Sequence, residues 1–131
     1  MTTLRSDADD AARRAYLGVG RGTLVEVDDS TKMQEVTVRA RFGRMLTNVE
    51  HWHPYGFTSV PLKPDDQEQR QAEVLITYLG GSLDHPVVVG IGDRRHRPKN
   101  LKAGESSHHD DQRQHTHLTR DGVNQTGKKV T

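Results

Sequence analysis

The sequence predicts an all-β domain over residues 1–92, built as a small barrel or sandwich, and a separate polar segment over residues 93–131. Short runs of β-branched and alternating residues, separated by turn signals, recur through the first part. That part also holds 36 of the 41 hydrophobic residues in the 131-residue chain. The chain has no cysteine, so disulfides, thiolate metal sites and a cysteine nucleophile are excluded.

The first residues predict a short helix over residues 7–16. Ser6 can cap this helix, aspartates stand in its first turn and arginines in its last, as the helix dipole favours. Gly18 and Gly20 are expected to end it.

Two strands are predicted after Gly22, joined by a turn at residues 28–30. Residues 23–28 are β-branched and partly alternating, and residues 33–41 place Val36, Val38 and Ala40 on one face with charged and polar residues on the other. This pattern is typical of a hairpin with one face in water.

Residues 49–59 carry the only tryptophan and two further aromatic residues, and Pro54 and Gly56 predict a bend there. The polar residues 63–71 predict a loop. Residues 72–79 and 86–91 predict two buried strands, separated by a turn at Gly80 and Gly81. The alternation within these strands predicts six barrel core residues, which are Val36, Val38, Val74, Ile76, Val87 and Val89.

Residues 93–131 differ sharply from the first part. They contain five hydrophobic residues, nine basic and five acidic residues, and five of the eight histidines. A segment of this composition cannot bury a core of its own. It is therefore either disordered or buries its few apolar residues against other copies of the chain.

The strongest local pattern in this segment is His115-Thr116-His117. Histidines at i and i+2 of a strand point to the same face. Two imidazoles alone make a weak metal site, but three chains around a threefold axis would supply six nitrogens, which suits iron, nickel, zinc or copper. The alternative is a polar strand whose histidines face water.

Other polar patterns favour simpler interpretations. His51-Trp52-His53 is interpreted as an aromatic loop anchor, and residues 108–111 as a polar turn. The basic cluster of residues 93–100 could meet phosphate, or serve as a solvated linker. No Gly-x-Ser-x-Gly motif is present, and the glycines at 18, 20 and 22 precede a strand rather than follow one, so enzyme signals are thin.

Three motifs in order resemble one known family. They are Pro-Tyr-Gly-Phe-Thr-Ser at 54–59, Asp-Arg-Arg-His-Arg-Pro at 93–98 and His-Leu-Thr-Arg-Asp-Gly at 117–122. With the stretches around residues 72–74 and 101–105, they resemble the Mu-type baseplate assembly protein V family, the central spike of contractile phage tails. The resemblance covers residues 15–123.

The resemblance implies an oligonucleotide/oligosaccharide-binding (OB) barrel followed by the start of a trimeric, triple-stranded β-helix needle. The expected domains are an N-terminal helical or flexible segment (residues 1–20), the OB hub (residues 21–97) and the needle start (residues 98–131), with the needle truncated in this chain. No catalysis is expected. The implied protein is a homotrimer that meets other baseplate and tail-tube proteins, caps the tail tube and helps puncture the host outer membrane.

Site expectations follow from the trimer. Leu118 and Val123 are predicted to pack at the threefold axis or its flanks, and iron or another transition metal at His115 and His117 is a candidate only on that axis. The expected location is the virion tail baseplate, after assembly in the bacterial cytoplasm. The alternative function is a monomeric OB module whose basic tail binds nucleic acid, which the near-zero net charge of +1 disfavours.

Overall fold

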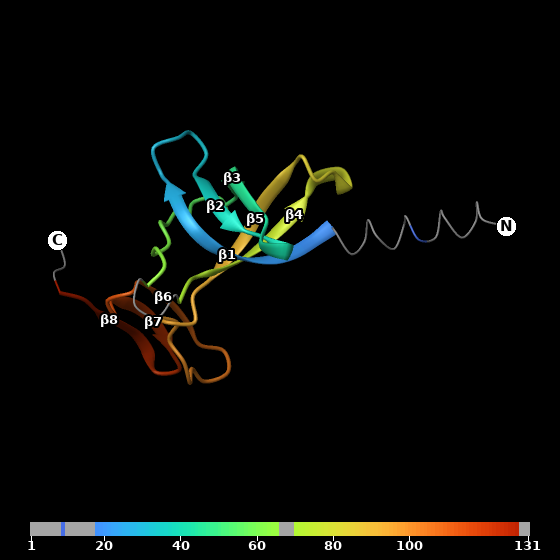
Figure 1. Cartoon of the computed structure of the whole chain (residues 1–131). Helices are drawn as coiled ribbons and strands as arrows, with labels where there is room; N and C mark the ends of the chain where they lie inside the picture. The colour runs from blue at the N-terminus through green and yellow to red at the C-terminus, as the bar shows by residue number, and fades with distance from the viewer. Residues whose placement is uncertain (1–8, 10–17, 66–69, 129–131) are drawn as a thin grey trace. The chain divides into compact units, whose positions relative to one another are not determined.

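The computed structural model describes residues 9, 18–65 and 70–128 (Figure 1). The chain divides into two compact units, residues 1–92 and 93–131, and this division coincides with the change in composition. In the described part of the chain, no helix is long and apolar enough to cross a membrane. The predicted helix over residues 7–16 lies outside the described residues, apart from Asp9.

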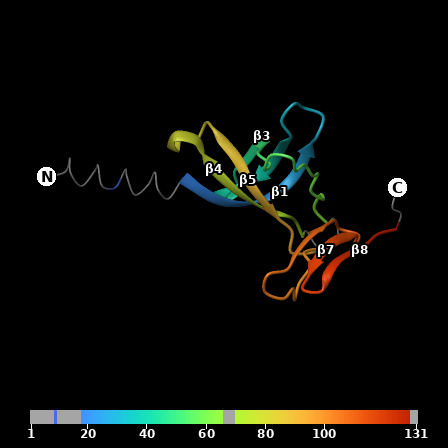
Figure 2. The same ribbon diagram turned by 180° about the vertical axis from the view of Figure 1, so that it is seen from behind.

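The first unit is a closed barrel of five strands. Around the barrel they follow the order β1 (Val19–Asp28), β2 (Glu35–Arg39), β3 (Met45–His51), β5 (Pro86–Gly92) and β4 (Glu73–Tyr78). Neighbouring strands are antiparallel except β3 and β5, which run parallel. Two short 3-10 turns, η1 (Arg41–Gly43) and η2 (Leu79–Gly81), complete the unit. Figures 1 and 2 show β1 beside β4 from both sides.

Strand β1 is long enough to serve two neighbours. Its first half pairs with β4 and its second half with β2, and Thr23 pairs with both. Gly22 lies just before this change of partner, and a Cβ atom there would come within 2.5 Å of the carbonyl oxygen of Arg39. The close approach of the two backbones therefore requires glycine.

The barrel core is aliphatic. Its buried members, each at most 8% exposed, are Leu24, Val36, Val38, Ala40, Leu46, Val49, Ala72, Val74, Ile76 and Val88. Five of the six predicted core residues are buried, since Val87 is also only 5% exposed.

The prediction for Val89 is wrong, because this side chain is 50% exposed. Leu75 pairs with Gly90 and Ile76 pairs with Val88, so Val89 is the extra residue of a β-bulge. The bulge shifts the alternation by one residue, and Val88 takes the inward position instead.

Two further elements differ from the sequence-based expectation. Residues 45–51 form strand β3, which the analysis of the sequence did not identify. Its register with β2 shifts between Val36 and Val38, and the resulting burial pattern departs from simple alternation. Strand β1 begins at Val19, inside the segment expected to precede the barrel.

The second unit is an antiparallel sheet of three strands, β6 (Ser106–His109), β7 (His115–Thr119) and β8 (Gly122–Thr126). Asp110 closes the turn between β6 and β7, because its Oδ1 accepts from the backbone N–H groups of Gln112 and Gln114 at 2.8 and 2.9 Å. The side chain of one aspartate thus supplies both acceptor contacts that close this polar turn.

Candidate assembly surfaces

The described aromatic side chains lie outside the barrel core. Tyr78 packs against the core from a partly buried position, and the other four are exposed. Phe42 is 95% exposed, Trp52 55%, Tyr55 103% and Phe57 64%. Exposed aromatic residues are typical of surfaces that bind another protein. We therefore examine the surfaces on which they lie.

The first surface is the aromatic arm, residues 52–62, which follows β3 without regular secondary structure. It also exposes Val60 and Leu62. The backbone N–H of Phe57 donates to the carbonyl of Pro54 at 3.0 Å, and Gly56 has φ +85°. This geometry fits a type II turn, which places Tyr55 at the tip. The turn fixes the backbone at this point of the arm, while the side chains of Tyr55 and Phe57 stay exposed.

A buried hydrogen-bond network attaches the arm to the barrel. Gln34 Nε2 donates to Asp29 Oδ1 and to the carbonyl of Ser59, both at 2.8 Å. Gln34 Oε1 therefore faces His51 Nδ1 at 2.7 Å. Since an amide oxygen only accepts, Nδ1 of His51 carries the proton. Gln34 thus connects β3, the β1–β2 loop and the arm.

His51 is neutral at ordinary pH. Burial lowers its pKa from 6.5 to about 4, and the neighbouring His53 adds to the effect. The two rings lie 4.0 Å apart, and the buried Nε2 atom of His53 has no hydrogen-bond partner among the described residues. Residues 51–53 were expected to anchor the loop through their aromatic rings. In the structure the two histidines are covered, while Trp52 is exposed, so the contact with the barrel is made by the polar imidazoles.

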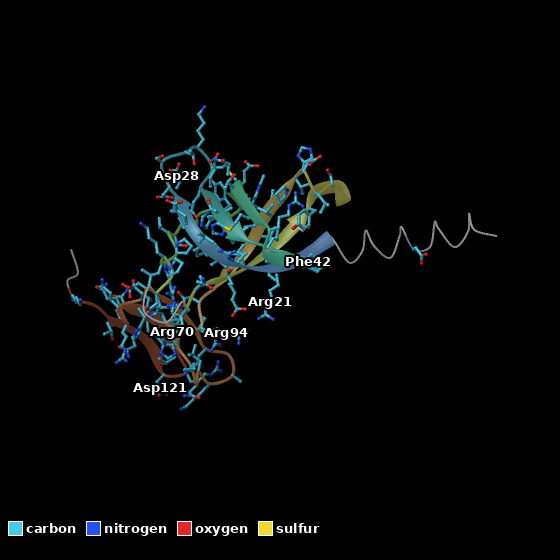
Figure 3. All side chains as sticks on the ribbon, viewed as in Figure 1. Arg21, Asp28, Phe42, Arg70, Arg94 and Asp121 are labelled. Atoms are coloured by element: carbon cyan, nitrogen blue, oxygen red, sulfur yellow. The ribbon has the colours of Figure 1, made fainter. Side chains whose placement is uncertain are left out.

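The second surface is the Phe42 end of the barrel, where η1 joins β2 to β3. Phe42 stands at φ +61° in this turn, and a hollow of about 150 Å³ lies beside it. Figure 3 shows Phe42 and Arg21 at the end of the barrel where β1 begins, while Asp28 marks the other end of β1. The sequence analysis missed this site. The sequence feature that marks this site is Arg-Phe-Gly at residues 41–43, with Arg39 and Arg44 nearby.

The third surface is the sheet of the second unit. Among residues 93–128 none is buried. Leu118 and Val123 are direct cross-strand partners, yet they are 48% and 67% exposed. An apolar pair in this position realises only part of its burial free energy when one chain folds alone.

The register separates the predicted site residues onto two faces. His115 lies opposite His109 on β6 and Thr126 on β8, and His117 shares their face. Leu118 and Val123 lie on the other face, because adjacent residues alternate. Only one face of a sheet can point toward an axis. The histidine pair and the apolar pair are therefore alternative inward faces.

The histidines differ in their availability to a metal. His115 Nδ1 lies 3.1 Å from the carbonyl of Arg113, which leaves Nε2 as the ligand atom. His117 Nε2 instead lies 3.2 Å from Glu105 Oε1. No cluster of three ligand side chains occurs among the described residues. Within one chain the pair therefore supplies two imidazoles without a third ligand, His115 through Nε2 and His117 through Nδ1, with Glu105 on the opposite nitrogen of His117.

Glu105 organises this unit. Its carboxylate accepts from the backbone N–H groups of Lys102 and Arg120, both at 3.0 Å, as well as contacting His117. These bonds, that from Lys102 first, hold the pKa of Glu105 below its usual range. One side chain thus joins the segment before β6 to β7 and the β7–β8 turn.

Comparison with known proteins gives matches to a single family. Residues 21–95 match the family model described as Bacteriophage Mu Gp45, N-terminal. The chain is 34% identical over 112 residues to the baseplate puncturing device gp45 of Escherichia phage Mu, a match that covers 84% of this chain and 52% of that protein. It is 30% identical over 94 residues to the Mu-like prophage FluMu protein gp45 of Haemophilus influenzae, covering 72% and 47%. The chain spans about half the length of these relatives.

Proposed function

The chain belongs to the bacteriophage Mu Gp45 family, and from this premise we propose that it is a structural component of a phage baseplate. In this proposal three copies form the central spike, which caps the tail tube and is driven through the host outer membrane. The protein acts through its shape and rigidity and carries no catalytic group. Other baseplate and tail-tube proteins are its partners.

The barrel is proposed as an OB fold that serves as the hub. Its strand order, β1-β2-β3-β5-β4, supports this, because the OB fold is a five-stranded barrel of similar construction. In the proposed role the barrel positions and clamps the spike rather than reading a nucleic acid.

One observation carries the trimer proposal, namely that β6, β7 and β8 form a regular sheet while residues 93–128 include no buried residue. Within this sheet β6 and β8 each have a neighbour on one side only. Intertwining with other copies would pair these edges and bury the apolar side chains. The residues then serve as the start of a β-helix, whose core exists only between chains.

We propose that the Leu118–Val123 face points inward and the His115–His117 face outward. Burial of six aliphatic side chains near a threefold axis is favourable, whereas burial of imidazoles requires a partner for every polar nitrogen. His117 already has its partner, Glu105, within the chain. In this arrangement a metal on the axis at His115 and His117 is not formed.

The mass in solution tests the trimer. Three chains of 14.7 kDa give about 44 kDa in light scattering coupled to size-exclusion chromatography. A stable monomer at micromolar concentration, with the second unit folded in its circular dichroism spectrum, would contradict the proposal.

Neighbouring residues on β8 supply a matched pair of variants. Val123 and Asn124 are both exposed in the single chain and point to opposite faces. Val123→Asp should dissociate the trimer, because three carboxylates would be brought together in an apolar interior. Asn124→Asp should leave the mass unchanged. The reverse result would place the histidine face inside.

Elemental analysis of the purified trimer tests the same point independently. We expect no stoichiometric transition metal. About one ion per trimer that is lost in the His115→Ala variant would instead place six imidazoles on the axis and overturn the proposed orientation of the sheet.

A further inference from the structure

We propose that the Phe42 end of the barrel, consisting of Phe42, Arg41, Arg44 and the hollow beside them, docks an acidic segment of another protein that carries a large apolar side chain. The inference rests on the proposed role of the chain as one component of a larger assembly. It adds the place on the barrel and the chemistry of the partner.

Phe42 is the first observation. Its side chain is 95% exposed, and its backbone lies in the left-handed region at φ +61°. A bulky residue in that region is strained, and this one contributes nothing to the barrel core. Strain without a packing gain in the folded chain is typical of a functional position. Among the described residues, none covers the ring.

The hollow beside Phe42 is the second observation. Its wall includes the apolar side chains of Ile76, Tyr78 and Leu83 together with Ala40. Its volume of about 150 Å³ suits one large side chain of a partner. An exposed aromatic ring beside an apolar hollow is the usual form of an interface hot spot.

Charge defines the rest of the partner. Arg21, Arg41 and Arg44 line the hollow, and none of the acidic residues that the structure describes does. Glu73 pairs with Arg21 at 2.7 Å. Arg44 is exposed and pairs with no carboxylate in the described part of the chain. Guanidinium groups bind carboxylates in a fixed geometry, so a segment with carboxylates beside its apolar residue is complementary.

The hollow lies at the end of the barrel where β5 begins. Tyr78, in the wall of the hollow, pairs with Pro86 at the start of β5, whereas Gly92 at the end of β5 pairs with Glu73. The chain therefore leaves the barrel at the other end of β5.

The chain's own acidic cluster favours a different protein over a second copy. Glu26, Asp28, Asp29 and Glu35 line a depression at the far end of β1 from Arg21. Docking of Phe42 there would join barrels head to tail, and such a contact yields open filaments unless the rotation closes. A different protein at the Phe42 end is compatible with a closed trimer, because it does not link barrels head to tail.

The chain has only two phenylalanines, which makes fluorine NMR a direct test. Full-length protein labelled with 4-fluorophenylalanine should give two signals, assigned with a Phe57→Leu variant. Three synthetic peptides serve as probes: one with Leu-Trp flanked by aspartates, one with Leu-Trp flanked by lysines, and one with Ser-Ser flanked by aspartates. The first should shift the Phe42 signal in a saturable manner and leave Phe57 unmoved.

The lysine-flanked peptide should bind at least about tenfold more weakly than the aspartate-flanked Leu-Trp peptide. Added salt should weaken binding of the aspartate-flanked Leu-Trp peptide. Arg44→Gln should reduce binding of the acidic peptide, whereas Lys32→Gln, which removes a charge from the other end of the barrel, should not. Equal binding of acidic and basic peptides, or no shift at Phe42, would overturn the inference. A Phe42 signal that moves with protein concentration alone would overturn it too, in favour of a second copy.

The mass of each sample separates this inference from the proposed function. If the acidic peptide fails to bind an intact trimer, the docking inference alone is wrong. If the chain is a monomer that still binds the peptide at Phe42, the trimer proposal is wrong and the docking surface stands.

Discussion

The barrel and the second unit are both made of β-strands, but they obtain their stability from different sources. The barrel buries ten aliphatic residues in one cluster, while residues 93–128 bury none. The second unit is instead held by hydrogen bonds from polar side chains such as Glu105 and Asp110. Such bonds contribute little net stability in water. The comparison shows that the barrel has an aliphatic core of its own, and it supports the proposal that the second unit is stabilised by other copies.

The largest expected effect comes from a Leu→Ala substitution, which should act differently in the two units. Leu24 is fully buried. Its replacement by Ala should lower the free energy of unfolding of the barrel by about 3–4 kcal/mol, independent of protein concentration. Leu118→Ala should instead lower the midpoint only of a concentration-dependent transition. Urea unfolding at two protein concentrations, monitored by Trp52 fluorescence and by far-ultraviolet circular dichroism, measures both. A concentration-independent loss in Leu118→Ala would contradict the comparison.

A smaller loss is expected where two barrel backbones approach. Gly22→Ala would place a Cβ 2.5 Å from the Arg39 carbonyl and should cost about 2–3 kcal/mol. Gly90→Ala is the matched control, because the nearest atom to its Cβ would be Leu75 Cδ1 at 3.9 Å. The difference between their urea midpoints gives the effect. Equal midpoints would mean that β1 and β2 separate without cost.

Acid should weaken the barrel before the second unit. The native pKa of His51, about 4, lies below the ordinary 6.5, so the unfolded chain binds a proton that the native barrel does not. Stability is therefore full above pH 6.5 and falls by about 3 kcal/mol as the pH drops to 4. The His51→Phe variant should have a lower but flatter profile over this range.

The Glu105 carboxylate of the second unit provides the contrast. Because the pKa of Glu105 is lowered below its usual 4.5, its contribution is present above that pH and is lost only in stronger acid. Proton NMR of His51 and His117 between pH 7 and 4 follows the two units separately. Simultaneous loss of both signals near pH 6 would show that they do not unfold independently.

The smallest effect concerns the Phe42 end. Phe42→Gly should stabilise the free barrel by up to about 1 kcal/mol, because glycine adopts φ +61° without steric strain. Phe42→Ala keeps the strain and serves as control. Thermal melts of both variants give the comparison. Destabilisation by glycine but not by alanine would show that the ring packs against the barrel in solution.

Much of the fold was predictable from local patterns. Strands around residues 23–28, 35–39, 73–78 and 86–91 follow from β-branched residues between turn signals. The burial of Val36, Val38, Val74 and Ile76 follows from alternation. Strand β3 was missed and Val89 was misplaced, since register shifts next to both change which residues face inward. A bulge depends on the partner strand, which is not encoded in the local pattern.

The candidate surfaces divide in the same way. The sequence is sufficient to identify the family. It also shows that residues 93–131 contain few apolar side chains and that Leu118 and Val123 are among them. The separation of that pair from His115 and His117 required the strand register. The Phe42 end and the Gln34–His51 network required the fold itself, because they join residues from separate strands and loops.

The sequence by itself thus determined that the chain is β-rich, that its apolar residues are concentrated before residue 93, and which family it belongs to. These are properties of composition and order along the chain. Only the tertiary structure decided that the aromatic residues it describes stay out of the core and that Phe42 stands strained in water. The physical reason is that burial and strain depend on contacts between distant segments, and closure of the barrel selects which side chains those contacts leave exposed.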